Sequence, residues 1–178
     1  ESSNLDDDSI EILQLKQGVQ TSLLAWTTTP WTLSGSAALA VSVDAEYSLV
    51  EREDQHIGIE RIIVATDRVS DLAPDGSVLA SFKGSSLIGA HYEELWSAEL
   101  WEDADPYMFV DGVAVRPASL DDLPSRKVVA SDEVTTDEGT GVLHVAPAFG
   151  AEDYGIGRAN DLMFLQPVRP DGIVLGGP

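Results

Sequence analysis

The sequence predicts an α+β fold that is mainly β, with a β-barrel-like core and a few short helices. Short runs of β-branched or alternating apolar residues recur along the chain, and turn signals separate them. Residues 151–162 instead carry apolar residues at helical spacing. The chain has 178 residues, 43% of them hydrophobic, which is enough for one core. We therefore expect residues 1–178 to form a single domain excised from a larger protein, with 1–10 and 176–178 as linker edges.

Most elements of the N-terminal half are predicted to be strands. Residues 67–72 suit a short helical turn, Pro74-Asp75-Gly76 is a turn signal, and residues 84–89 suggest a tightly packed connection. The pattern of residues 77–82 leaves a short strand or a helix open. Strands are expected within residues 13–25, 37–43, 47–51 and 58–66.

The C-terminal half is predicted to continue this β pattern around one helix. Residues 96–105 read as a polar and aromatic loop. Asp111-Gly112 between two short apolar runs, 108–110 and 113–115, is a strong hairpin signal. We further expect strands at residues 127–130 and 141–146, a helix at 151–162, and a turn at 168–172 that leads into a final strand.

Composition excludes several classes of site. The chain contains no cysteine, which rules out disulfides, thiolate metal sites and a cysteine nucleophile, and it fits a cytoplasmic location. Its three histidines (His56, His91, His144) lack the spacing of metal ligands, so no metal or cofactor is expected. No apolar run approaches the roughly 20 residues that span a bilayer, and the acidic start differs from a signal peptide.

The net charge is −21, from 31 acidic and 10 basic residues. We interpret it as a solubility device, such as that of a salt-adapted proteome, because the acids are spread along the chain without the spacing of a calcium loop. A cation-binding surface is the alternative. Such a charge also repels a nucleic acid, whose binding normally depends on Lys and Arg.

A first distinctive segment runs from Trp26 to Leu33 and contains Thr27-Thr28-Thr29-Pro30. In an extended chain Thr27 and Thr29 face one way and Thr28 the other, and Pro30 disfavours a helical Thr29. Such hydroxyls can bind a ribose, an ester or a water. The alternative is an ordinary threonine-rich strand with its tryptophans in the core.

A second segment spans residues 139–154. Gly139 and Gly141 permit close backbone approach by a ligand, and His144 lies on a predicted strand. Asp153 falls near a helix start, where a carboxylate can hold an ammonium group. The alternatives are a core histidine with its hydrogen bonds satisfied, and a carboxylate that only stabilises the first turn of its helix.

Together the two segments resemble the editing domain, connective peptide 1, of isoleucyl-tRNA synthetases, which are class I aminoacyl-tRNA synthetases. Residues 82–92 resemble a further stretch of that family, and the likeness covers most of residues 20–175. It implies a synthetase editing-domain fold and hydrolysis of mischarged valyl-tRNA(Ile), an aminoacyl-tRNA deacylase activity within an isoleucine–tRNA ligase. The ATP-site signatures His-x-Gly-His and Lys-Met-Ser-Lys-Ser are absent, so ATP binding is expected of the parent enzyme only.

The resemblance also implies roles for individual residues. Asp153 would anchor the α-amino group, His144 and Trp31 would line the side-chain pocket, and Thr28 and Thr29 would position the ester and a water. The catalytic residues implied are Thr28, Thr29 and Asp153. The substrate-binding residues implied are Trp26, Thr27, Trp31, His144, Ala146 and Asp153. The implied partners are the 3′ end of tRNA(Ile) and the rest of the parent synthetase in cis, with no membrane and a monomeric chain.

Two rival functions remain open. A valyl-tRNA synthetase editing domain would hydrolyse threonyl-tRNA(Val), and His144 and Ala146 argue against it. A non-catalytic acidic β-barrel that binds another molecule would leave the threonine cluster and Asp153 unexplained. His144 can also act as a general base, although we favour a pocket wall.

Overall fold

The computed structural model describes residues 19–93, 106–119 and 122–175. The described chain is mainly β, with short helices, as the sequence predicts. The expectations for residues 1–18, 96–105 and 176–178 fall outside the described residues. None of the helices in these ranges has the length and apolar content to cross a membrane.

The strands are β1 (Thr21–Leu23), β2 (Ala38–Val41), β3 (Glu46–Asp54), β4 (Gly58–Ala65), β5 (Ser77–Lys83), β6 (Tyr107–Val110), β7 (Val113–Val115), β8 (Lys127–Ala130), β9 (Val142–Val145) and β10 (Met163–Phe164). The 3-10 helices are η1 (Pro30–Gly35), η2 (Thr66–Arg68) and η3 (Gly84–Leu87), and the α-helices are α2 (Val69–Leu72) and α3 (Ala151–Ala159). The strands form three sheets, with orders β1-β4-β3-β5, β10-β6-β7 and β8-β2-β9.

The chain divides into two compact units. Unit 1 comprises Glu1–Trp26, Ala40–Ala90 and Val128–Leu143. Unit 2 comprises Thr27–Leu39, His91–Lys127 and His144–Pro178. The assignment of residues 1–178 to one domain stays a prediction.

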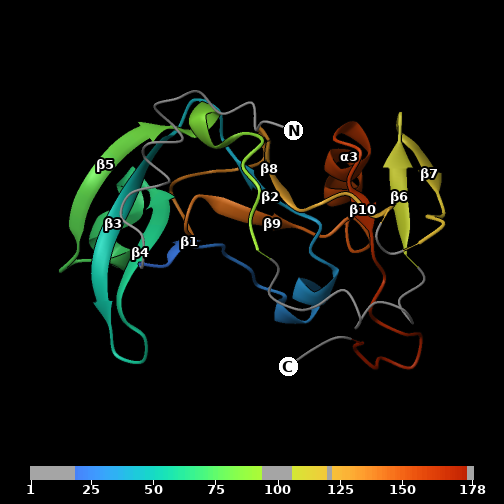
Figure 1. Ribbon diagram of the computed structural model, residues 1–178, viewed down its shortest axis with the longest axis horizontal. Coiled ribbons are helices and arrows are strands. Elements are labelled where there is room, and N and C mark those ends of the chain that lie inside the picture. Colours follow the sequence, from blue (N-terminus) through green and yellow to red (C-terminus); the bar gives the residue numbers. More distant parts are fainter. Residues whose placement is uncertain (1–18, 94–105, 120–121, 176–178) are drawn as a thin grey trace. The chain divides into compact units, whose positions relative to one another are not determined.

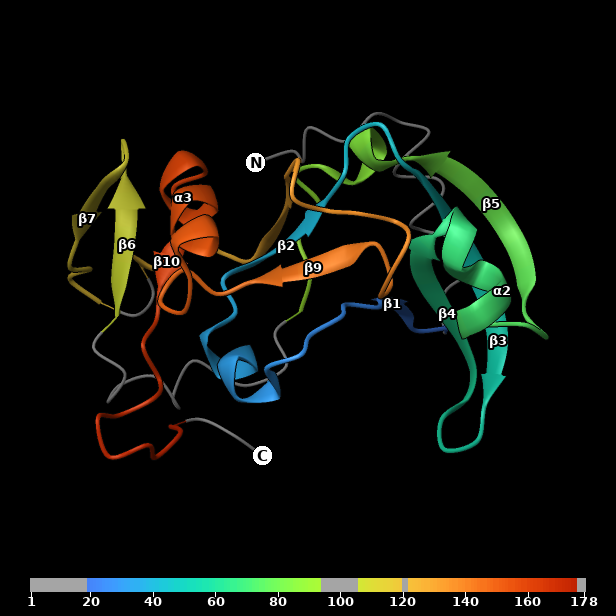
Figure 2. The ribbon, with the colours of Figure 1, turned by 180° about the vertical axis from the view of Figure 1, so that it is seen from behind.

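Unit 1 is built on the four-stranded sheet (Figure 1). β3 pairs antiparallel with both β4 and β5, and β1 lies parallel to β4. Figure 2 shows α2 lying against β4 and β3. Apolar side chains join these elements: Val50, Ile62, Val64 and Ala73, with Leu24, Val69 and Leu72 at their edge. Burying a side chain of this size contributes about 1.5–3 kcal/mol. Consecutive residues of β3 (Leu49, Val50) and of β4 (Ile62 to Ala65) are buried, so both faces of this part of the sheet are covered.

A buried tyrosine fixes the start of β9 in unit 1. The Tyr47 hydroxyl receives the Ser42 N–H at 3.0 Å and donates to the Gly141 carbonyl at 2.7 Å. Gly141 has a φ of +73°, and a Cβ there would lie 2.4 Å from the Cβ of Ala65. Only glycine therefore allows the chain to enter β9 so close to β4.

Unit 2 contains the predicted hairpin. Asp111 and Gly112 have φ values of 49° and 72°, and the two positive angles match the turn that two-residue hairpins favour. β10 pairs antiparallel with β6. Edge-to-face ring contacts join Phe109, Tyr154 and Phe164, with centroids 5.3–6.4 Å apart, and so pack α3 against β6 and β10.

Two expectations need correction, and one ambiguity is resolved. Residues 77–82 belong to a strand, β5, because they pair with β3. The helix expected over 151–162 ends at Ala159. The final strand expected after residue 172 is wrong as far as residue 175, where the described chain ends: a single bridge joins Val168 and Val174, and the last strand of the described residues, β10, precedes the turn. Ile173 is 53% exposed, so this stretch lacks the buried face that would hold a strand.

Two glycines in α3 offer a matched test of this packing. We expect Gly155→Ala to stabilise the protein by about 0.5–1 kcal/mol, because nothing lies within 4 Å of its new Cβ and alanine favours the helix. We expect Gly157→Ala to cost about 1–3 kcal/mol, because its Cβ would meet the Pro147 ring at 2.7 Å. Chemical denaturation measures both variants. Equal or greater stability of the Gly157 variant would contradict the close packing of α3 on Pro147.

Candidate functional site

Unit 2 brings together three threonine hydroxyls from the first segment. Pro30 occupies the first position of η1 and Thr29 caps it, so Thr29 and Thr32 share one face, as residues three apart do in a 3-10 helix. The Thr32 hydroxyl donates to the Thr29 carbonyl at 2.8 Å and lies 3.1 Å from the Thr29 hydroxyl. The Thr29 N–H donates to the Thr27 hydroxyl at 3.0 Å, while Thr28 is exposed. The predicted alternation of the three threonines is therefore observed.

His144, on β9, completes this cluster. Its side chain is 6% exposed, and its Nε2 lies 3.0 Å from the Thr27 hydroxyl and 3.4 Å from that of Thr32. Its Nδ1 is buried and has no hydrogen-bond partner among the described residues. Burial lowers the pKa of His144, and the charge of Asp153 opposes that effect. The imidazole is thus neutral at pH 7. In the part of the chain that the structure describes, only one of its two ring nitrogens, Nε2, has hydrogen-bond partners, so His144 differs from a core histidine whose hydrogen bonds are all satisfied.

Asp153 lies in the first turn of α3. Its Oδ2 accepts the Ala146 N–H at 2.8 Å, so the carboxylate ties the helix to the end of β9. The N-cap of α3 is Gly150, with no side-chain hydrogen bond. Burial raises the pKa of Asp153, while the Ala146 N–H and His144 lower it and Glu152 raises it further. The carboxylate is therefore more than a capping group: it is a partly desolvated anion next to a neutral imidazole.

Such a carboxylate can pair with an ammonium ion, because an opposite charge offsets the cost of its burial. The neighbouring hydroxyls and imidazole are neutral donors and acceptors that can orient a polar substrate or a water. No group of three or more metal-binding side chains occurs in the described ranges. The chemistry that this arrangement allows is binding and positioning of a cationic polar molecule.

The other predicted site residues are placed differently. Trp31, on η1, is 55% exposed, so the alternative that it belongs to the core is wrong. The side chain of Ala146 is 1% exposed, and its contribution is the backbone N–H that binds Asp153. Thr27, Trp31, His144, Ala146 and Asp153 all belong to unit 2, whereas Trp26 belongs to unit 1.

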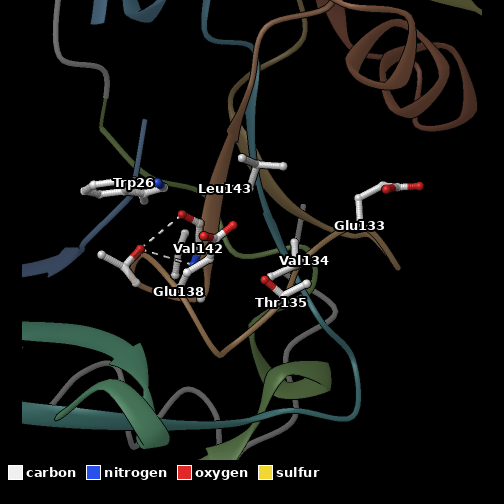
Figure 3. A pocket seen from close by; sticks show the side chains of 9 residues that line it. Trp26, Glu133, Val134, Thr135, Glu138, Val142 and Leu143 are labelled. Atoms are coloured by element: carbon white, nitrogen blue, oxygen red, sulfur yellow. Dashed lines mark hydrogen bonds between the residues drawn. The ribbon is translucent and has the colours of Figure 1, made fainter. Parts of the chain in front are cut away.

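Trp26 lines a cleft of about 110 Å³ in unit 1, between the segment that follows β1 and residues 133–143 (Figure 3). The indole is 51% exposed, which also excludes a core role. It packs on Gly139, where a Cβ would lie 2.8 Å from its ring, and the backbone N–H of Trp26 donates to the Val142 carbonyl at 3.0 Å. Arg68 donates to the carbonyls of Gly139 and Asp137 and holds this wall in place.

Sequence reasoning missed Thr32. This residue is 4% exposed and bonds to both Thr29 and His144. The signal was present, because a proline after Thr29 marks the first turn of a helix and Thr32 lies three residues on. The contact with His144, 112 residues away, could not be read from the sequence.

The chain is similar to segments of isoleucine–tRNA ligases, although no family model matches it. The ligase of Nocardia farcinica is 39% identical over 153 residues, which are 84% of this chain and 12% of the ligase. That of Picrophilus torridus is 35% identical over 170 residues, 95% of this chain and 14% of the ligase. The chain thus spans 12–14% of the length of these curated relatives.

Solved structures of synthetase editing domains share its fold. A crystal structure of GlLeuRS-CP1 gives a TM-score of 0.55 at 20% identity and covers 83% of this chain and 46% of that chain. The editing domain of the P. knowlesi cytosolic leucyl-tRNA synthetase gives 0.51 at 15% identity, covering 75% and 48%. The predicted mainly β class with a few short helices and the editing-domain fold are thereby confirmed, whereas the strands of the described residues lie in three sheets and no closed barrel is seen.

The raised pKa of Asp153 has a consequence for stability. The pKa of this carboxyl group is higher in the folded protein than its ordinary value of 3.8. The protein therefore loses stability as the pH rises from 3.8 through the pKa of the folded state. We expect Asp153→Asn to escape this loss and to melt at or above the wild-type temperature at pH 7, because the amide oxygen can still accept the Ala146 N–H. Thermal denaturation between pH 3 and pH 7 measures the difference.

Glu152→Gln is the matched control, since it removes the same charge from the same helical turn at an exposed position. A marked drop in the melting temperature of Asp153→Asn at pH 7, absent in Glu152→Gln, would show that the carboxylate stabilises the fold instead.

Proposed function

Since the chain belongs to the isoleucyl-tRNA synthetase family, as a segment with the editing-domain fold, we propose that it hydrolyses the ester of mischarged valyl-tRNA(Ile). The observation that carries this proposal is the grouping of Asp153, His144 and the threonine hydroxyls in unit 2. The activity is a deacylation that removes a wrong amino acid after its transfer to tRNA. It would serve the isoleucine–tRNA ligase of which this chain is a part.

Asp153 binds the α-ammonium group of the amino acid in this proposal. Only one carboxylate oxygen is engaged by Ala146 N–H, and within the described residues the other oxygen accepts no hydrogen bond. Burial raises the pKa of the carboxyl group, so a bound cation is favoured because it stabilises the ionised form. The ester of an amino acid carries such a cation next to the bond to be broken.

Thr28 and Thr29 position the ester and the attacking water. Hydroxyl groups are weak bases, so the rate enhancement comes mainly from orientation, to which a hydroxyl of the terminal ribose can contribute. Exposed Thr28 is available to the substrate, whereas Thr29 is fixed by contacts with Thr27 and Thr32. Thr27 acts indirectly by holding His144 at 3.0 Å.

His144 and Trp31 form walls of the side-chain pocket that admits valine and excludes isoleucine. One methylene contributes only about 1–3 kcal/mol to discrimination in an apolar pocket, a limit for which isoleucyl-tRNA synthetases are themselves the usual example. A second, smaller site corrects the error by excluding the larger side chain. Ala146 contributes through its backbone, and Trp26 contributes a stacking surface at its own cleft in unit 1.

With a net charge of −21, this chain repels the polyanionic tRNA, so another part of the enzyme must bind the tRNA body. We assign the grip on the tRNA body to the rest of the parent synthetase in cis, which leaves this chain to receive only the aminoacylated 3′ end. The chain acts as a monomer in the cytoplasm in this proposal, and its own residues need no cofactor.

The relatives support isoleucyl over valyl editing, because those compared are isoleucine–tRNA ligases. Hydrolysis of threonyl-tRNA(Val) is therefore the second candidate. A binding module without catalysis is the third, and it would leave the threonine cluster and Asp153 without an explained role.

The first test is deacylation of valyl-tRNA(Ile) by the 178-residue chain, with isoleucyl-tRNA(Ile) and threonyl-tRNA(Val) as competing substrates. We expect selective loss of valine, and a fall in kcat/KM of about 100-fold or more in Asp153→Asn through lost pairing with the ammonium group. Glu152→Gln serves again as the charge-matched control. Preference for threonyl-tRNA(Val) would indicate a valyl-tRNA synthetase editing domain instead. Full activity of Asp153→Asn would refute the proposal that this carboxylate binds the α-ammonium group.

The salt dependence of the reaction independently tests the proposal that the rest of the parent synthetase, and not this chain, binds the tRNA body. Proteins that grip tRNA through cations lose affinity as salt is added. We expect the opposite for this chain, an increase in kcat/KM between low and about 0.5 M salt, because screening weakens the repulsion between two polyanions. A steep decrease would show that the chain carries a cationic tRNA-binding surface of its own. A short aminoacylated minihelix, which carries fewer phosphates, should show a weaker salt effect.

A further inference from the structure

The protons of the threonine cluster can be assigned from its hydrogen bonds. Thr32 has one hydroxyl proton, and the Thr29 carbonyl at 2.8 Å can only accept it. The Thr32 oxygen must therefore accept in its other contacts, which are the Thr29 hydroxyl at 3.1 Å and His144 Nε2 at 3.4 Å. A contact that Thr32 accepts from His144 requires a proton on Nε2.

The remaining contacts agree with this assignment. Thr29 gives its proton to Thr32, so the 3.4 Å contact between the hydroxyls of Thr27 and Thr29 is a hydrogen bond only if Thr27 donates. Thr27 has then used its proton and must accept from His144 Nε2 at 3.0 Å. Thr27 also accepts the Thr29 N–H, which fills its second lone pair.

The opposite tautomer of His144 leaves contacts unsatisfied. With the proton on Nδ1, the lone pairs of Nε2 and the Thr32 oxygen would face each other at 3.4 Å. Thr27 would turn its proton to Nε2 and lose the bond to Thr29. A buried Nδ1–H would also lack an acceptor among the described residues, and an unpaired buried N–H is rarer than an unpaired acceptor.

We propose that Thr32 is a positioning residue that sets the direction of a hydrogen-bond relay, from His144 Nε2–H through Thr27, Thr29 and Thr32 to the Thr29 carbonyl. The relay holds His144 as the Nε2–H tautomer. It also points the Thr29 proton away from the substrate, so that the free lone pair of the Thr29 hydroxyl accepts a hydrogen bond from the attacking water. That last step rests on the proposed deacylase function, whereas the direction of the relay does not.

Thr32→Val removes the end of the relay while preserving side-chain shape. The freed Thr29 proton can then turn to Thr27, and the Thr27 proton to His144 Nε2, which reverses the direction and populates the Nδ1–H tautomer. Thr32→Ser keeps the hydroxyl and should behave like the wild type. Thr29→Val breaks the relay one step earlier and frees the Thr27 proton, so it should populate the same tautomer. The shift should be smaller than in Thr32→Val, because Thr32 still donates to the carbonyl and still accepts from Nε2–H.

Nitrogen-15 NMR of histidine-labelled protein near pH 7 reads the tautomer directly. The chain has only three histidines, and His56 and His91 are exposed, so His144 can be assigned with a His144→Gln variant. We expect protonated Nε2 and unprotonated Nδ1 in the wild type and Thr32→Ser, and a population of the reverse tautomer in Thr32→Val and Thr29→Val. Protonated Nδ1 in the wild type, or an unchanged tautomer in both valine variants, would overturn the proposal.

Kinetics separate this proposal from the proposed function. With valyl-tRNA(Ile), we expect Thr32→Val to lower kcat about tenfold or more with little change in KM, and Thr32→Ser to restore it. A wild-type chain without deacylase activity would defeat the proposed function and leave the NMR result to decide the relay. An active wild type whose His144 carries the proton on Nδ1 would defeat the relay and leave the function intact.

Discussion

A buried imidazole must find partners for its nitrogens inside the protein, and the site in unit 2 depends on how His144 meets this requirement. Thr32 contacts its Nε2 from η1, which begins at Pro30, and Thr27 contacts it from the segment that precedes η1. Those hydroxyls would themselves be costly to bury alone. The threonines and His144 Nε2 therefore satisfy one another, while Nδ1 has no partner among the described residues, and the candidate site follows from the ordinary rule that most buried polar groups are paired.

Asp153 shows the same coupling between stability and function. Its hydrogen bond to the Ala146 N–H fixes the start of α3 against the end of β9. Burial nevertheless raises the pKa of the carboxyl group, so the folded protein carries an anion in a poorly solvated place. Proteins tolerate such a group where it meets a ligand of opposite charge, and natural sites often trade stability for binding in this way.

Local sequence signals predicted the elements well where one short-range cause dominates. Asp111-Gly112 needs two positive φ angles, which these residues tolerate, and the hairpin forms there. Strands were predicted at residues 47–51 and 58–66, and β3 and β4 lie there. Prediction failed at residues 173–174, where apolar side chains suggested a strand, because burial against another surface, rather than composition, decides whether a strand persists. The exposed indoles of Trp26 and Trp31 were ambiguous for the same reason.

The sequence by itself determined the mainly β character, the absence of thiol chemistry, the charge of −21 and the two segments that carry the candidate site. It also determined the alternation of Thr27, Thr28 and Thr29, because that follows from backbone geometry over three residues. Only the tertiary structure decided that Thr32 meets His144, that Asp153 binds the Ala146 N–H, and that Trp26 lines a cleft in unit 1. These contacts join residues brought together by folding, and local sequence patterns carry no information about such distances.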